Sequence, residues 1–398
     1  MFSIYADSSS IDVNKYIIAT YSVTSNSTLH DAAWNIAVGQ SVGNPSVRNT
    51  WESNHLVETH SCVILDDQAA LLGAQHGSFR IGFPVVNFDF NTDGIPQLLC
   101  HLMGGHTDID LIAKCSLDNL VFPPSVLASA LPPKFGSSWI RNRVGRHNKP
   151  LLGGIIKPKT GLSLSVLLEI TKQLVDGGVD FIKEDEILGN PLFLRLDDRV
   201  EVINNYLTKT GSKVVFCHTL NCLPHRLEQQ ARRVVELGGN GIHINVWSGL
   251  GIYQSIRCLD LPLFIHYQKS GARVITDSSN SYRIAWPVLC QLAALSGVDS
   301  LQTGMIGGYS NDNLNEVLQA LQVLRAHNVL PALSCGMHPG LVDKIVSDIG
   351  PEFLANVGGA IHGHPNGSRA GTAAMRQAID HVYGSEYDLA VAEWGRVE

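Results

Sequence analysis

Two short motifs hold the residues best suited to chemistry. Lys157 and Lys159 form a Lys-Pro-Lys motif directly after an apolar run, and a Lys-Glu-Asp-Glu motif over 183–186 follows the next run. The carboxylates of Asp185 and Glu186 are hard oxygen ligands of the kind that Mg²⁺ prefers. A lysine beside such a metal can carry protons when burial and the metal lower the pKa of its amine.

Further polar residues and glycines follow later apolar runs. They are His266, Ser334-Cys335-Gly336, Gly358-Gly359 and His362-Gly363-His364. Paired glycine N–H groups before a helix can bind an anion. Taken singly, the charged motifs also fit solvated loops, His266 fits a core histidine and the glycines fit close packing. A zinc site at the last motif would lack a third nearby ligand. Their common place at the ends of apolar runs favours one shared site.

The elements that must position these residues form a regular pattern after about residue 150. Amphipathic helical segments separate eight expected strands: Leu151–Ile156, Val179–Ile182, Lys213–Cys217, Gly241–Val246, Leu261–His266, Ser300–Thr303, Ala332–Ser334 and Leu354–Val357. Eight strand–helix units close a (β/α)₈ TIM barrel, whose active site lies at the carboxyl ends of the strands. No Gly-x-Gly-x-x-Gly motif follows a strand, which makes a Rossmann sheet the weaker interpretation.

The chain before this pattern alternates less regularly. Strand and helix candidates are Lys15–Val23, Thr28–Gly39, His60–Leu65, Gly77–Phe88 and Ile95–Met103. Proline pairs at 123–124 and 132–133 indicate a linker. We therefore expect an α/β protein with a small α+β domain over residues 1–130 and a catalytic barrel over residues 131–398.

The composition excludes several classes of function. The 398 residues carry a net charge of −7 and show no basic patch, so we expect no nucleic-acid partner. No apolar run of about 18 residues is present, so we expect no membrane span. The eight cysteines form no Cys-x-x-Cys pair, and the start MFSIYADSSS does not resemble a secretory signal. The expected protein is a cytoplasmic enzyme of small molecules.

Together these residues suit the enolisation of a phosphorylated ketone. A metal held by Asp185 and Glu186 would stabilise the oxygens of an enediolate, and Lys157 would move a proton. The glycine-rich ends of the last two strands would hold a phosphate.

Several segments resemble the RuBisCO large-subunit superfamily. GGIIKPKTGLS and GGVDFIKEDE are similar to its two signature segments, and LFIH, LSCG, NVGGAIHGHPNG, FPVVNFDF and PPKFG continue the match. The resemblance implies that CO₂ carbamylates Lys183, which then holds Mg²⁺ with Asp185 and Glu186. It implies that Lys157 carries protons and that His266 lines the site. Substrate and phosphate contacts are expected from Lys159, Ser334, Gly336, Gly358 and Gly359. It also implies a homodimer, in which the N-terminal domain of one subunit completes the site of the other.

The chain departs from true carboxylases at their cationic positions. Gly308, with Tyr309 beside it, stands where they carry a mobile lysine after the sixth strand. Tyr267 replaces an arginine that binds the second phosphate, and Ser270 replaces a histidine. Arg273 could compensate in part. The sequence therefore resembles a RuBisCO-like protein, form IV, that does not fix CO₂.

Within that group, GMHPGLV, HPNGSRAG and IHYQKSGA resemble the 2,3-diketo-5-methylthiopentyl-1-phosphate enolases of methionine salvage. Those enolases take their base from a lysine in the N-terminal domain, where this chain has Gly105. They also keep only the first lysine of the Lys-Pro-Lys motif. The carbamate on Lys183, Lys157 or His106 could serve as the base instead.

Three hypotheses remain open from the sequence. The first is a Mg²⁺-dependent enolase or isomerase of a phosphorylated keto sugar derivative. The second is a decarboxylase of a β-keto sugar-acid phosphate, which passes through the same enediolate without a carbon-acid base and so suits Gly105. The third is a non-catalytic regulatory or binding relic. The retained set of Lys157, Lys183, Asp185 and Glu186 argues against the relic.

Overall fold

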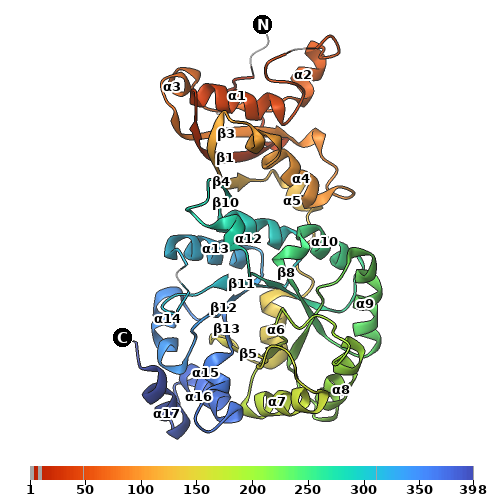
Figure 1. Cartoon of the computed structure of the whole chain (residues 1–398), viewed down its shortest axis with the longest axis vertical. Helices are drawn as coiled ribbons and strands as arrows, with labels where there is room; N and C mark the ends of the chain where they lie inside the picture. The colour runs from red at the N-terminus through yellow and green to blue at the C-terminus, as the bar shows by residue number, and fades with distance from the viewer. Residues whose placement is uncertain (1–3, 8–10, 48, 311, 398) are drawn as a thin grey trace. The chain divides into compact units, whose positions relative to one another are not determined.

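The computed structural model describes residues 4–7, 11–47, 49–310 and 312–397. The chain divides into two compact units (Figure 1). The first contains residues up to Ala130 together with Ala272–Leu295, and the second contains Leu131–Gly271 and the residues from Ser296 onward. The segment Ala272–Leu295 lies in the range that the sequence pattern placed in the barrel domain. None of the helices in the described ranges is long and apolar enough to span a membrane.

A five-stranded sheet organises the first unit, in the order β10-β4-β1-β3-β2. Its strands are β1 (Tyr16–Ser25), β2 (Val63–Ile64), β3 (His76–Pro84), β4 (Ile112–Val121) and β10 (Tyr282–Ile284). Alternate residues of β1 are buried, as expected for a strand with one covered face. The late strand β10 pairs in parallel with β4, and this pairing explains why residues 272–295 belong to this unit.

The helices of the first unit are short. They are η1 (Val13–Lys15), α1 (Leu29–Gly39), α2 (Asn54–His60), α3 (Gln68–Leu72), η2 (Val85–Asn87), α4 (Gly94–Leu102), η3 (Gly105–Asp108), α5 (Pro124–Ser129), α11 (Arg273–Thr276) and α12 (Trp286–Leu295). The strand expected over His60–Leu65 is reduced to β2, because His60 ends α2. The Ser53 hydroxyl starts that helix by accepting a hydrogen bond from the N–H of Leu56.

Eight parallel strands close a barrel in the second unit, which confirms the predicted fold class. They are β5 (Leu151–Ile155), β6 (Phe181–Lys183), β7 (Val215–Thr219), β8 (Gly241–Asn245), β9 (Phe264–Gln268), β11 (Ser300–Gly304), β12 (Leu330–Leu333) and β13 (Leu354–Val357). Pairing of β13 with β5 completes the ring. Strand β9 begins three residues later than predicted, because Pro262 has no N–H to donate to a neighbouring strand.

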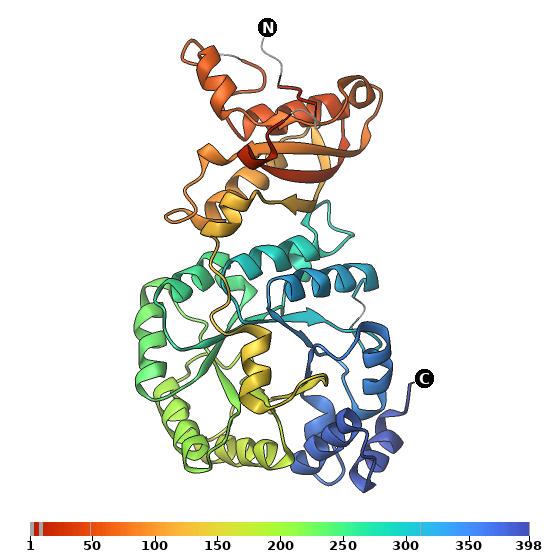
Figure 2. The ribbon, with the colours of Figure 1, turned by 180° about the vertical axis from the view of Figure 1, so that it is seen from behind.

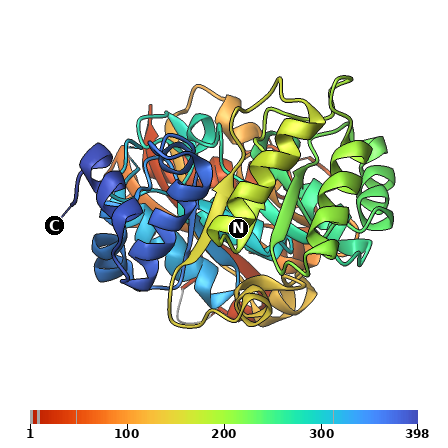
Figure 3. The ribbon, with the colours of Figure 1, turned by 90° about the horizontal axis from the view of Figure 1, so that it is seen from below.

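Helices surround the barrel and close one of its ends. They are α6 (Gly136–Val144), α7 (Leu164–Gly177), α8 (Leu196–Lys209), α9 (Pro224–Glu236), η4 (Val246–Ser248), α10 (Leu250–Cys258), α13 (Leu314–Ala326), η5 (Pro339–Leu341), α14 (Val342–Ile349), α15 (Gly359–His362), α16 (Ser368–Asp380) and α17 (Ser385–Trp394). Figure 2 shows α6 in the middle of the ring, where Ile140 packs on inward residues such as Phe181 and Phe264. Helices α15, α16 and α17 gather side by side (Figure 3). With α6 at the end where the strands begin, only the carboxyl ends of the strands remain for a site.

Candidate active site

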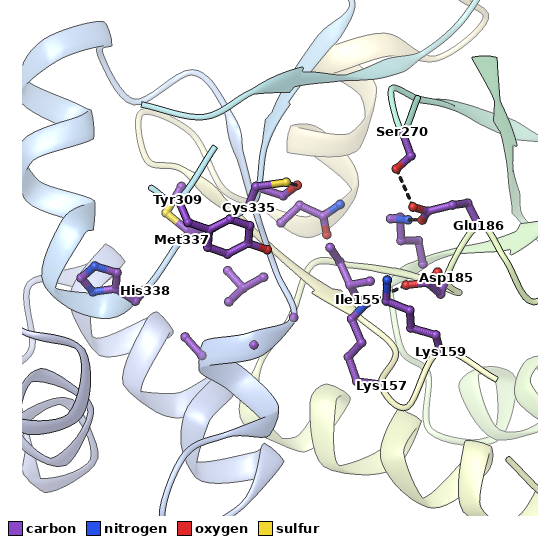
Figure 4. A pocket seen from close by; sticks show the side chains of 18 of the residues that line it. Ile155, Lys157, Lys159, Asp185, Glu186, Ser270, Tyr309, Cys335, Met337 and His338 are labelled. Carbon is purple, nitrogen blue, oxygen red and sulfur yellow. Dashed lines mark hydrogen bonds and ion pairs between the residues drawn. The ribbon is translucent and has the colours of Figure 1, made fainter. Parts of the chain in front are cut away.

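A pocket with a volume of about 380 Å³ lies at the carboxyl ends of the barrel strands (Figure 4). Most of the residues that the sequence singled out line it: Lys157, Lys159, Lys183, Asp185, Glu186, Ser334, Gly336, Gly358 and Gly359. Strands β5, β6, β12 and β13 each end at this pocket, so residues far apart in the chain meet there. The volume is in the range of pockets for small molecules.

Two lysine–carboxylate pairs occupy one side of the pocket. The Nζ of Lys157 donates to Oδ2 of Asp185 at 2.6 Å, and the Nζ of Lys183 lies 3.1 Å from Oε2 of Glu186. The hydroxyl of Ser270 donates to the other oxygen of Glu186 at 2.5 Å. Asp185 is therefore held from the loop after β5, whereas Glu186 is held from the end of β6 and from the loop after β9 (Figure 4).

Burial and charge act in opposite directions on this cluster. The side chain of Lys183 is 1% exposed, and burial lowers the pKa of its amine, although Glu186 and Asp185 oppose that shift. Burial would raise the pKa of Glu186, but the charge of Lys183 and the hydrogen bond from Ser270 outweigh it and lower that pKa to about 2. Glu186 is therefore a carboxylate at neutral pH.

The four residues 183–186 do not all face the pocket. Glu184 points away from it, and its Oε1 accepts from Nε of Arg199 at 2.8 Å and lies 3.0 Å from Nδ1 of His218. Burial opposes the ionisation of Glu184, but Arg199 and His218 prevail and lower its pKa to about 2. Glu184 thus ties β6 to α8 and β7, and this pairing holds Lys183 and Asp185 inward.

The glycine-rich side of the pocket is formed by the ends of β12 and β13. Gly336 has φ +109°, and a Cβ there would lie 2.7 Å from the backbone N of Tyr309. A Cβ at Gly358 would lie 3.2 Å from Cε of Lys157, whereas one at Gly359 would meet nothing within 4 Å. Bare backbone therefore faces the space beside Lys157, as the anion-binding expectation requires.

The three histidines that the sequence motifs singled out lie outside the pocket. His266 is fully buried and faces the barrel interior below the pocket, where its Nδ1 lies 2.5 Å from Oγ of Ser300. Burial lowers its pKa to about 3, so it is neutral. His362 contacts the carbonyl of Ile155, and His364 contacts the carbonyl of Glu386. None of these histidines is among the residues that line the pocket.

The positions that set this chain apart from carboxylases lie as follows. Tyr309 lines the pocket and its side chain is largely exposed. Tyr267 is fully buried and packs on the ring of Tyr253 in α10, at 5.1 Å between centroids, so it does not face the pocket. Arg273 pairs with Asp277 at 2.5 Å. The described lysines that line the pocket all lie at the ends of β5 and β6.

His106, one of the three candidate bases, is enclosed within the first unit. The residue is 4% exposed, and its ring meets Tyr21 edge-on and places Nε2 3.9 Å from Sγ of Cys115. Burial lowers its pKa to about 4. These contacts are those of a histidine packed in the core beside the fully buried Tyr21.

The sequence motifs missed several pocket residues. They include Gln268, Met337, His338, Asn356 and Trp394. Gln268 and Asn356 follow His266 and Leu354 by two residues, so the alternation of side chains along a strand could have found them. Trp394 ends α17, 36 residues beyond Gly358 (394 − 358), and no local pattern marks it.

The donor set fits a magnesium ion only if Lys183 is modified. Among the described residues, no group of three or more His, Cys, Asp or Glu side chains could hold a metal. Asp185 and Glu186 supply two carboxylates, and a protonated lysine is no ligand. A carbamate on Lys183, whose Nζ lies 3.1 Å from Glu186, would add an anionic oxygen donor. The three residues then fit the metal that the resemblance implies.

Comparison with known proteins places this site in a family. A model of the ribulose bisphosphate carboxylase large chain, catalytic domain, matches residues 136–330 and 318–396. The chain is 32% identical over 386 residues to the 2,3-diketo-5-methylthiopentyl-1-phosphate enolase of Exiguobacterium sibiricum, which covers 93% of this chain and 94% of that relative. It is 27% identical over 434 residues to a ribulose bisphosphate carboxylase of Archaeoglobus fulgidus, covering 99% and 97% of the two chains.

Solved structures agree with these matches. A rubisco-like protein from Alicyclobacillus acidocaldarius has a TM-score of 0.83 and 29% identity, covering 96% of this chain and 100% of that one. An octameric RuBisCO from Pyrococcus horikoshii has a TM-score of 0.84 and 25% identity, covering 96% and 91%. The chain therefore belongs to the RuBisCO large-chain family. Within that family it is similar to RuBisCO-like proteins and to enolases in particular.

Proposed function

We propose that this protein is a Mg²⁺-dependent enolase or isomerase of a phosphorylated keto sugar derivative similar to 2,3-diketo-5-methylthiopentyl-1-phosphate. The observation that carries the proposal is the meeting of Lys157, Lys183, Asp185 and Glu186 in one pocket beside glycine backbone. The enolase names of relatives that align over more than nine-tenths of the chain support it.

The proposed cofactors are Mg²⁺ and CO₂, the latter as a carbamate on Lys183. Lys183, Asp185 and Glu186 would hold the metal, which when bound supplies positive charge to the oxygens of an enediolate. The hydrogen bond from Ser270 orients the Glu186 carboxylate. The ion pair of Glu184 with Arg199, on the side away from the pocket, fixes the backbone of the Lys-Glu-Asp-Glu motif. The phosphate of the substrate would lie on the backbone of Gly358 and Gly359 and near Lys159.

Lys157 is the proposed proton carrier. Its amine lies at the pocket, 2.6 Å from Asp185, and its stem passes Gly358, where the proposed phosphate site begins. A neutral amine at this position would take a proton from the carbon next to a carbonyl and return it to another carbon or oxygen. His106 does not support the role of base, because it is packed within the core of the first unit.

Fixation of CO₂ onto ribulose bisphosphate is not proposed. No residue at 308 or 309 is cationic, and Tyr267 packs on Tyr253 instead of facing the pocket. A second phosphate would then meet no described lysine or arginine among the lining residues on the side of Tyr309. Burying an unpaired phosphate charge is costly.

The proposed assembly is a homodimer whose subunits share their active sites. A similar solved structure is described as an octameric RuBisCO, which is consistent with oligomerisation in this fold. The mass of the protein in solution, measured by light scattering, tests the dimer.

The reaction is tested by a screen of monophosphorylated keto compounds with Mg²⁺ and bicarbonate. In D₂O, an enolase exchanges a carbon-bound hydrogen of its substrate for deuterium, which mass spectrometry detects. Release of CO₂ without exchange would replace the proposal with the decarboxylase, which Gly105 also suits. If the protein binds neither Mg²⁺ nor CO₂ and catalyses neither reaction, the result would point to a non-catalytic protein.

A further inference from the structure

Both polar atoms of the Asn356 side chain lack a hydrogen-bond partner among the described residues. Asn356 lies on β13, two residues before Gly358, and is among the residues that line the pocket, although its exposed fraction is 0%. Among the residues that the structure describes, none accepts a hydrogen bond from its Nδ2 or donates one to its Oδ1. A buried amide whose donor and acceptor both lack hydrogen bonds lowers the stability of the fold. Such a group needs an explanation, and a hydrogen bond to a bound ligand supplies one.

The barrel makes room for this amide. Asn356 pairs with Gly153 of β5, and a Cβ on Gly153 would lie only 2.7 Å from Oδ1 of Asn356. Further along β5, Ile155 pairs with Lys183 of β6. The amide therefore occupies a gap in the inner surface between the glycine backbone of β13 and the lysine–carboxylate cluster.

The chemistry of an amide selects its partner. The Nδ2 group donates and the Oδ1 atom accepts, so the amide complements a neutral oxygen such as a hydroxyl or a carbonyl. A phosphate group would gain one donor but would bring its negative charge against Oδ1. The phosphate site proposed at Gly358 and Gly359 lies beyond the end of the same strand, at the start of α15.

We propose that Asn356 is a substrate-binding residue whose amide hydrogen-bonds an uncharged hydroxyl or carbonyl oxygen of the substrate's carbon chain. The inference rests on the proposed function in that it places this oxygen between the phosphate and the metal-binding end of the substrate. Asn356 thereby discriminates a keto sugar phosphate from a bare phosphate.

The test compares the wild-type protein with Asn356→Leu and Asn356→Ala. Calorimetric titration with ribulose 5-phosphate and with inorganic phosphate, both with Mg²⁺ and bicarbonate, measures the preference for a carbon chain bearing neutral oxygens. Thermal unfolding without ligand measures stability. Neither readout requires turnover, so absence of enolisation would contradict the proposed function without touching this inference.

We expect the wild type to prefer ribulose 5-phosphate and both variants to lose about 3- to 10-fold in affinity for it, the range that one neutral hydrogen bond provides. Their affinity for inorganic phosphate should stay unchanged. The Tm of Asn356→Leu should be unchanged or higher, because the unmet amide is removed. If Asn356 served only to stabilise the fold, its replacement would lower the Tm and leave the preference for ribulose 5-phosphate unchanged.

Asn240 offers a matched control. It is an asparagine of the same barrel whose Oδ1 accepts from the N–H of Phe216 and whose Nδ2 donates to the carbonyl of Val214, both at 2.9 Å. Asn240→Leu should lower the Tm and keep the preference between the two probes. Equal binding of both probes by the wild type, an unchanged preference in the Asn356 variants, or a fall in their Tm like that of the control would each overturn the assignment.

Discussion

The Nζ of Lys157 lies 2.6 Å from Oδ2 of Asp185, and this contact joins the loop after β5 to the loop after β6. Asp185 is almost fully buried, whereas the side chain of Lys157 is 29% exposed and reaches the pocket. The same acid is a proposed metal ligand. The proposed proton carrier and the proposed metal site are thus neighbours, so a change in one alters the charge at the other.

Replacing Lys157 should stop proton transfer. We expect Lys157→Met to lower kcat for hydrogen exchange by about 10²- to 10⁴-fold, the usual contribution of a general acid or base. Lys159→Met is the matched change in the same motif, and because Lys159 is proposed to bind phosphate it should raise KM more than it lowers kcat. Exchange of substrate hydrogen in D₂O measures both parameters. Similar kcat values for Lys157→Met and the wild type would reject the role.

Binding of Mg²⁺ should require CO₂. A cationic lysine repels the metal, while a carbamate on Lys183 provides an oxygen donor beside Asp185 and Glu186. Calorimetric titration should therefore show Mg²⁺ binding to the wild type only with bicarbonate, and Lys183→Ala should show none. Lys172→Ala, at an exposed lysine on α7, is the control and should bind as the wild type does. Equal Mg²⁺ affinity with and without CO₂ would contradict the carbamate model.

Ribulose bisphosphate should not be carboxylated. Carboxylation needs a cation over the nascent carboxylate, and neither Gly308 nor Tyr309 carries one. The loss of one such contact typically costs ~2–4 kcal/mol, or ~30- to 1000-fold in rate, and the change at Tyr267 adds to it. The measurement is incorporation of labelled CO₂ into acid-stable product beside a true carboxylase. Turnover at the level of that enzyme would refute the prediction.

The buried pair of Glu184 and Arg199 should make stability depend on pH. The pKa of Glu184 is lowered to about 2 from its ordinary value of 4.5, so its ionic contribution is complete above pH 4.5 and is lost as the pH falls toward 2. Glu184→Gln leaves the buried Arg199 without its charge partner and should cost about 3–5 kcal/mol at pH 7.

Thermal unfolding at several pH values measures this effect. The difference in stability between wild type and Glu184→Gln should be largest at pH 7 and should shrink below pH 4.5. Glu169→Gln, at an acid that is 58% exposed, should change stability little at any pH. A pH-independent difference for Glu184→Gln would show that packing, and not charge, accounts for it.

The barrel and much of its site follow from local sequence patterns. Short strand-like runs of three to six residues with helical segments between them can be recognised one at a time, and eight of them imply closure. Because all strands of a closed parallel barrel end on the same side, Lys157, Asp185 and Gly358 could be placed together from their position after a strand. The magnesium expectation came from the carboxylates of Asp185 and Glu186, and the carbamate expectation came from resemblance to the family. Both remain proposals.

Long-range pairing determined what the sequence pattern did not predict. Residues 282–284 join the sheet of the first unit because β10 pairs with β4 at the edge of that sheet. No local pattern in either segment indicates this pairing. Glu184 turns away from its neighbours because Arg199, 15 residues later, offers a buried partner. Asn356 has room for its amide only because the residue paired with it across the ladder is Gly153. Each of these depends on a contact between distant residues, and such a contact exists only once the chain has folded.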